Sequence, residues 1–252
     1  MAWVMLTGFA VTLPPALLLA DPAQLTWPIL GLLAVVGLSN VAGLLIEYVA
    51  FRRGKVGVVT GIASTEGMVA ALISVAAGAP LHPLTGVLLA LVTAGVAVTA
   101  TSPDIAERDA DPNGRTVRAA VLAIPVALLF GLTLYVTGRI GVRISVLWAL
   151  LPARMVGSAL LAAPLAARRR LRLTRRALPL VAAAGLAEVL GVVSYVVGAR
   201  QQLAIAAVLS SQFAALTAVA AYFLHGQRLT GRQLAGLAAV AIGVAMLSAF
   251  GQ

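Results

Sequence analysis

The chain contains 252 residues, of which 61% are hydrophobic and only 10% are charged, whereas soluble domains carry about 45–50% and about 25%. This composition excludes an ordinary water-soluble globule, because its surface would need many more Lys, Glu, Asp and Arg side chains. The net charge of +10 would suit nucleic acid, so the positions of the basic residues decide what it means. Cysteine is absent, which excludes disulfides, thiolate metal sites and cysteine nucleophiles.

Apolar runs of about 20 residues, the length that crosses a bilayer core of roughly 30 Å, fill the chain almost end to end. In chain order, the expected spans are 1–20, 28–51, 56–78, 84–101, 117–138, 144–167, 177–198, 203–225 and 231–250. The first lacks the preceding Lys or Arg of a secretory leader, so we interpret it as a membrane helix. Runs such as 28–39 lack the alternation of a β-barrel strand. The sequence therefore predicts an all-α, polytopic transmembrane helical bundle of about nine spans.

An internal repeat relates the two halves of the chain, 1–101 and 117–252, which a polar linker at 102–116 separates. A shift of about 148 residues pairs several positions of the two halves. The pairs are Gly37 with Gly185, Gly43 with Gly191, Arg52 with Arg200, Gly78 with Gly226, and Gly95-Val96-Ala97 with Gly243-Val244-Ala245. Matched helices lie an odd number of spans apart, so the copies should cross the membrane in opposite directions. Inverted repeats are typical of secondary transporters, in which two similar halves alternate access to one central site.

The basic residues indicate the orientation, because short cytoplasmic loops are enriched in Lys and Arg. Most of the 18 basic residues fall on one side of the expected spans, including the cluster at 168–176. That cluster could contact nucleic acid, but a topogenic, lipid-facing loop is the better interpretation in this context. The expected location is the cytoplasmic (inner) membrane of a bacterium, with Met1 inside and Gln252 outside.

One C-terminal run carries a family resemblance. It reads Val208-Leu209-Ser210-Ser211-Gln212-Phe213-Ala214-Ala215-Leu216-Thr217, then Phe223-Leu224-His225-Gly226-Gln227-Arg228-Leu229-Thr230, then Gln233-Leu234-Ala235-Gly236 and Gly243-Val244. It resembles the end of an EamA-type repeat of the drug/metabolite transporter superfamily, with its Ser-rich helix start, Phe-Leu-Gly-Glu-Arg-Leu turn and Gln-x-x-Gly helix. A fainter copy runs from Ala50 to Val59 and continues at Ile62-Ala63-Ser64.

The chain also departs from the family pattern. The acidic residue of the turn is Gln227, and the proline after the Ser-rich start is replaced by Ala214 and, in the first half, Gly67. About nine spans stand where the family has ten, and the repeat indicates that the helix ahead of residue 1 is the missing one. The resemblance implies alternating-access transport of a small organic solute, a metabolite or drug, most simply by efflux.

Ionisable residues inside the expected spans are candidates for the substrate site, because each costs about 2.5–3.5 kcal/mol on insertion scales. Four lie away from the span ends: Glu66, Arg154 and Glu188 near the centre of their spans, and Glu47 about one turn from the end of its helix. Arg154 is expected either to clamp a substrate carboxylate or phosphate, or to form a buried pair with Glu188 or Glu66. Glu66 first, and Glu188 second, are candidates for carrying a coupling proton.

The repeat places further polar residues at equivalent positions. Glu188 falls on Asn40, Tyr195 on Glu47 and Gln212 on Ser64. The first two positions are seven residues apart on one helix face, so we expect them to line a common polar cavity. The alternative is that these polar side chains only hydrogen-bond between helices. Trp148 is a further candidate for lining a pocket for an organic solute.

Other chemistry is not expected. His82 and His225 lack a second ligand at metal spacing, and no Walker, HExxH or G-x-S-x-G motif occurs, so we predict neither a metal nor a cofactor and no enzyme of those classes. The alternatives that remain are a membrane-embedded lipid-handling protein or enzyme, which would use Glu66, Glu188 and Arg154 on a lipid head group, and a non-transporting remnant.

Overall fold

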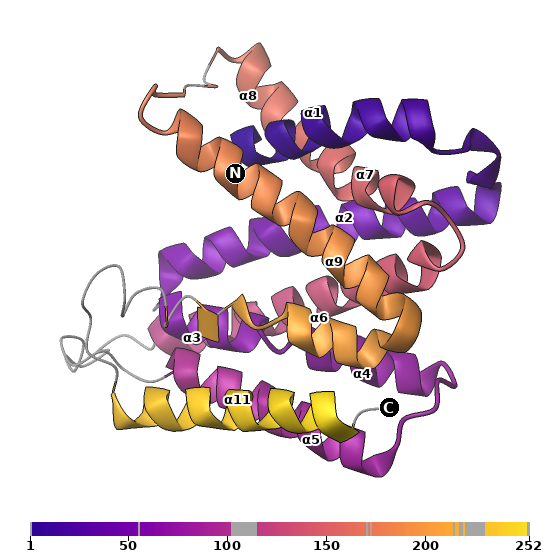
Figure 1. Cartoon of the computed structure of the whole chain (residues 1–252). Coiled ribbons are helices and arrows are strands. Elements are labelled where there is room, and N and C mark those ends of the chain that lie inside the picture. The colour runs from indigo at the N-terminus through magenta and orange to yellow at the C-terminus, as the bar shows by residue number, and fades with distance from the viewer. Residues whose placement is uncertain are drawn as a thin grey trace. The chain divides into compact units, whose positions relative to one another are not determined.

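The computed structural model describes residues 2–54, 56–101, 115–169, 171, 173–213, 215–216, 219 and 230–250. These residues form helices and connecting turns, with no β-strand among them (Figure 1). The helices are α1 (Ala2–Leu19), η1 (Pro22–Gln24), α2 (Trp27–Arg53), α3 (Val56–Ala63), α4 (Glu66–Ala76), α5 (Pro83–Thr101), α6 (Arg115–Gly141), α7 (Val146–Gly157), η3 (Ser158–Ala162), α8 (Ala163–Ala167), α9 (Leu178–Ser210) and α11 (Gly231–Phe250). The expected all-α class is therefore confirmed for this part of the chain.

Within the described ranges, six helices are long and apolar enough to cross a membrane. They are Ala2–Leu19, Trp27–Arg53, Val58–Ala76, Val117–Gly141, Val146–Ala167 and Leu178–Ser210, and two shorter apolar helices follow at Pro83–Thr99 and Gly231–Leu247. Large apolar side chains stay exposed on them: Leu18 is 81% exposed and Leu180 73%. Water would disfavour such a surface, whereas lipid accommodates it, which indicates a membrane protein.

Three of the expected spans differ from separate, continuous helices. The span expected at 56–78 breaks after Ala63, where the Ser64 hydroxyl donates to the Thr60 carbonyl at 2.7 Å and the Thr65 hydroxyl to the Ile62 carbonyl at 2.7 Å. The spans expected at 177–198 and 203–225 begin as the single helix α9, which bends at Gln202 (φ −143°, ψ 103°). Both interruptions have a local cause, since hydroxyl groups compete for carbonyls and an extended residue interrupts the helical hydrogen bonds.

The described chain forms two compact units. The first comprises Met1–Val41 and Val136–Leu203, and the second comprises Ala42–Tyr135 and Ala204–Gln252. Each unit thus combines segments from both halves of the sequence. Most of the expected linker at 102–116 lies outside the described residues.

In the first unit, α1 packs against α7 and η3. Two hydrogen bonds join the connection after α1 to the start of α7. The Ser145 amide donates to the Gln24 Oε1 at 2.7 Å, and the Trp148 Nε1 donates to the Asp21 carbonyl at 3.0 Å. Ser145 also caps α7, because its hydroxyl accepts from the Leu147 amide. The start of the helix that carries Arg154 is therefore fixed by polar contacts.

In the second unit, α5 packs against α11, α3 and α4. Its apolar core contains Ala71, Leu88, Leu89, Val92, Ala204, Val208 and Leu247. Helices α5 and α11 lie side by side in Figure 1, and their backbones nearly touch at a pair of glycines. A methyl group on Gly95 would lie 2.7 Å from the Gly236 carbonyl oxygen, and one on Gly236 would lie 2.6 Å from the Gly95 carbonyl oxygen. Small residues permit such close packing in membranes.

We expect Gly236→Ala to destabilise the protein by about 1–3 kcal/mol, because the added methyl group overpacks the contact with Gly95. Gly191→Ala is the matched control. A methyl group there meets nothing within 4 Å, so helix propensity should make that variant neutral or more stable by up to about 1 kcal/mol. Thermal unfolding of the two purified variants measures the difference, and equal melting temperatures would contradict the close contact.

Candidate functional site

The strongest candidate site is centred on Arg154, near the end of α7. Its side chain is only 2% exposed, and its Nη1 lies 2.8 Å from the Glu188 Oε1 on α9. The Glu188 side chain is 33% exposed, so one end of the ion pair is open while the other is enclosed. Of the two pairings expected from the sequence, the structure forms the one with Glu188. Glu66 belongs to the other unit.

Helix α1 provides the space for the Arg154 guanidinium at Gly8. A methyl group on Gly8 would lie 2.8 Å from the Arg154 Nε and 2.9 Å from its Cδ. Any larger residue at this position would displace the arginine. The sequence analysis did not single out Gly8, because its proximity to Arg154 depends on the packing of α1 against α7.

Three polar side chains around this α1–α7 packing bury atoms that have no protein partner. These atoms are the Arg154 Nε and Nη2, the Trp3 Nε1 and the Ser158 Oγ. Leaving a buried polar atom unpaired costs about 1–3 kcal/mol. All three groups can donate hydrogen bonds. Of these groups, the Arg154 guanidinium suits a ligand with paired acceptors, above all a carboxylate or phosphate.

Trp3 and Ser158 were absent from the sequence prediction, although a signal existed for Ser158. It follows Arg154 by four residues, and residues at this spacing share a helix face. The Asn40 Oδ1 on α2, which the repeat did single out, is also buried without a partner in the first unit.

The two aromatic candidates of the first unit are buried. Trp148 donates its indole N–H to the Asp21 carbonyl, so this group is engaged in holding the connection after α1. Tyr195 packs with its hydroxyl against α6, where a methyl group on Gly138 would lie 2.7 Å from that oxygen. Trp148 therefore stabilises the first unit through its contact with the connection between α1 and α2, and Tyr195 does so through its contact with α6.

The remaining candidates, Glu47, Ser64, Glu66 and Gln212, belong to the second unit. Ser64 forms the break between α3 and α4, and Glu66 begins α4, where the helix dipole favours a negative charge. The Glu47 carboxyl is buried, and it is close enough to Glu66 for the two to interact electrostatically. Gln212 lies in the turn that ends α9.

The two interrupted helices of the second unit meet at Gly67. A methyl group on Gly67 would lie 2.5 Å from both the Ala207 carbonyl oxygen and the Ser211 Oγ. Gln212 donates its Nε2 to the Val208 carbonyl at 2.9 Å, while its Oε1 is buried without a partner. The structure thus brings the helix break at Ser64 and the turn at Gln212 into the same packed region, next to Glu66.

Two further sequence predictions concern metal binding and the turn that resembles the family. In the part of the chain that the structure describes, no three His, Cys, Asp or Glu residues are grouped to hold a metal ion. The turn that carries much of the family resemblance, Phe223 to Leu229 with His225 and Gln227, lies outside the described residues.

The fold and these two polar clusters define an α-helical protein of membrane type, with ionisable side chains enclosed in its helices. No family model matches the chain, and no curated protein matches it. A solved structure described as "Crystal structure of protein" is similar, with a TM-score of 0.76 and 15% sequence identity over 98% of this chain and 85% of the other. At this identity the similarity establishes the fold alone.

Proposed function

We propose that the protein is a secondary transporter that moves a small organic solute with an anionic group across a bacterial cytoplasmic membrane. The observation that carries this proposal is Arg154. It is enclosed in an apolar span, one nitrogen is paired with Glu188, and Nε and Nη2 are unpartnered. A carboxylate or phosphate of the solute would satisfy these donors in the bidentate geometry that guanidinium groups favour.

Helix boundaries support the inverted repeat of this proposal. Shifting α1 by the same interval of about 148 residues gives 150–167, which matches α7 to α8 (Val146–Ala167). Shifting α5 gives 231–249, which matches α11 (Gly231–Phe250). Gly54, where α2 has ended, shifts onto Gln202, where α9 bends.

Helix packing supports the same repeat. Helix α1 packs against α7, its counterpart under the shift, and α5 packs against its own counterpart α11. Equivalent helices thus pair within each compact unit. With the two shorter apolar helices, Pro83–Thr99 and Gly231–Leu247, the described residues contain eight apolar helices of the about nine spans that the proposal expects. Discontinuous helices beside polar groups are typical of transporter sites.

The proposed alternating access requires that the solute leaves chemically unchanged. We expect purified protein in sealed proteoliposomes to carry an anionic amino-acid, organic-acid or nucleotide-sugar probe across the bilayer, and to be protected against thermal unfolding by the same probe. Intact labelled probe recovered on the far side supports transport, and efflux predicts accumulation of the probe in the lumen of inside-out vesicles. Accumulation of a modified lipid or solute instead would indicate the membrane-embedded enzyme.

A further inference from the structure

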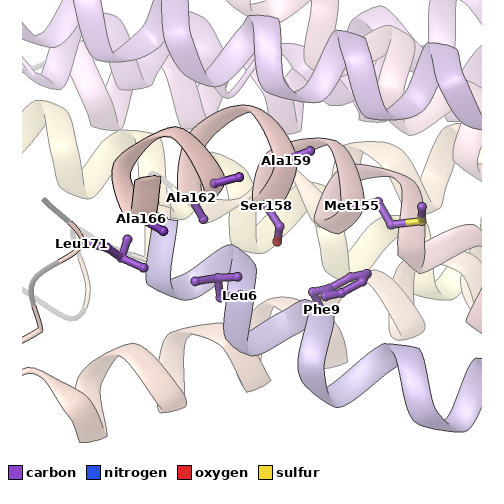
Figure 2. A pocket seen from close by; sticks show the side chains of 9 residues that line it. Leu6, Phe9, Met155, Ser158, Ala159, Ala162, Ala166 and Leu171 are labelled. Atoms are coloured by element: carbon purple, nitrogen blue, oxygen red, sulfur yellow. The ribbon is translucent and has the colours of Figure 1, made fainter. Parts of the chain in front are cut away.

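A second site lies in the first unit, on the side of α7 to α8 that faces α1. It is a cavity with a volume of about 390 Å³. Figure 2 shows Leu6 and Phe9 of α1 among the residues that line it. The rest of the lining comes from the α7 to α8 segment and the residues after it: Met155, Ser158, Ala159, Ala162, Ala163, Ala166 and Leu171. Pockets that hold organic ligands have volumes of about 300–1,000 Å³, so this one is large enough for a ligand.

The lining is hydrocarbon apart from the Met155 thioether and Ser158. The hydroxyl oxygen of Ser158 is itself buried, so it presents little polar surface to an occupant. Alanines at 159, 163 and 166 are exposed along this wall. A polar solute would lose its hydration here without gaining hydrogen bonds, whereas an alkyl chain would lose nothing.

The length of the cavity corresponds to one leaflet of a bilayer. From Met155 to Ala166 the helix rises by about 16 Å at 1.5 Å per residue, which is about half of a hydrocarbon core of roughly 30 Å. The cavity occupies the second half of the span Val146–Ala167 and ends at Leu171, beyond the helix. An acyl chain that enters from one membrane surface has these dimensions.

Four arginines lie close in sequence to Leu171, at the end of the cavity. Arg168 ends α8, Arg169 follows it in a left-handed conformation (φ 52°), and Arg175 and Arg176 precede α9. All four are exposed. The sequence from 142 to 187 contains no Asp or Glu, so no acidic residue near them in sequence neutralises this charge. An anion at this end would be attracted by several arginines together.

We propose that this cavity binds a single anionic phospholipid of the cytoplasmic leaflet, with one acyl chain against Ala159, Ala163 and Ala166 and its phosphate at Arg168 and Arg169. The site is distinct from the Arg154–Glu188 pair and does not depend on transport. A bound anionic phospholipid also explains why an apolar cavity ends at a basic loop. The lipid would fill the space between α1 and α8, and would therefore stabilise the first unit.

The test compares lipids bound to the full-length protein. The protein is extracted from vesicles that contain equal amounts of phosphatidylglycerol and phosphatidylcholine, and native mass spectrometry measures which lipid stays bound. We expect phosphatidylglycerol to be retained preferentially. Arg168→Gln combined with Arg169→Gln should reduce this preference at least about fivefold, since each surface arginine contributes about that factor to anionic-lipid attraction.

Two matched controls separate this site from general charge and bulk effects. Arg52→Gln with Arg53→Gln removes the same charge from an exposed pair at the end of α2 and should preserve the preference. Ala163→Trp should fill the cavity and reduce retention of both lipids, while Ala183→Trp, at an exposed alanine of α9, should not. Ala166→Phe replaces Ala163→Trp if the latter fails to fold. No preference in the wild-type protein, equal loss in the two arginine pairs, or unchanged retention in the cavity-filling variants would overturn the proposal.

Discussion

Arg154→Ala is expected to abolish solute transport while the purified protein remains folded. The substitution removes the buried guanidinium that would hold the anionic group, and loss of one partner of a buried charged hydrogen-bonded pair costs about 2–5 kcal/mol of binding. At about 1.4 kcal/mol per factor of ten, the transport rate at low solute concentration should fall at least about tenfold. Initial uptake rates in proteoliposomes measure this change, and size-exclusion chromatography checks folding.

Three further variants distinguish substrate binding by Arg154 from a purely structural ion pair between Arg154 and Glu188. Arg200→Ala is the control, because this exposed arginine donates its Nε to the Gly141 carbonyl and should have a small effect. Glu188→Gln leaves Arg154 buried and unpaired, so it should destabilise the protein more than Arg154→Ala does. If the pair is only structural, the double variant Arg154→Gln/Glu188→Gln should regain stability and transport. If Arg154 binds the solute, the double variant should regain stability but remain inactive.

Glu66→Gln is expected to eliminate the stimulation of transport by a proton gradient. Glu66 begins α4 at the break of a membrane span, and the nearby Glu47 adds a second negative charge. A proton bound by Glu66 would remove the repulsion between the two carboxyl groups, which gives proton binding a direct effect on the packing of the broken helices. Glutamine keeps the size of the side chain but cannot bind or release that proton.

The measurement compares uptake with and without an imposed gradient, at the same external pH. Ser64→Ala is the matched control, because it removes a hydroxyl group at the same helix break without changing charge. Wild-type protein and this control should both transport faster when the gradient is imposed. The Glu66→Gln variant should transport at the same rate with and without the gradient. Full gradient stimulation in Glu66→Gln would exclude this residue as the proton carrier and leave Glu188 to be tested.

The expected helices agree well with the structure where consecutive residues determine the position of a helix. Apolar runs located α1, α2, α6 and the α7–α8 span, since length and hydropathy are read from consecutive residues. The interruption at Ser64 was not expected, because hydroxyl back-bonding leaves the average hydropathy unchanged. The bend at Gln202 lies in the gap expected between the spans 177–198 and 203–225, although one helix, α9, continues across it. The 148-residue shift, however, already paired Ser64 with Gln212.

The candidate site was likewise predictable from the sequence only in part. The scarcity of charge identified Arg154, Glu188, Glu47 and Glu66 as the side chains that need a partner or a ligand, because burial of each is costly in any fold. Tertiary structure decided that Arg154 pairs with Glu188, that Gly8 makes room for it, and that Trp3 and Ser158 contribute unpartnered donors.

The sequence by itself thus determined an α-helical chain of membrane type and its few ionisable groups inside the spans, because the bilayer acts on each segment separately. Only the tertiary structure decided which of these groups meet and where the apolar cavity beside Arg168 lies. Such contacts join α1, α7 and α9, which are distant in sequence, and they depend on close packing of helix surfaces that hydropathy does not specify.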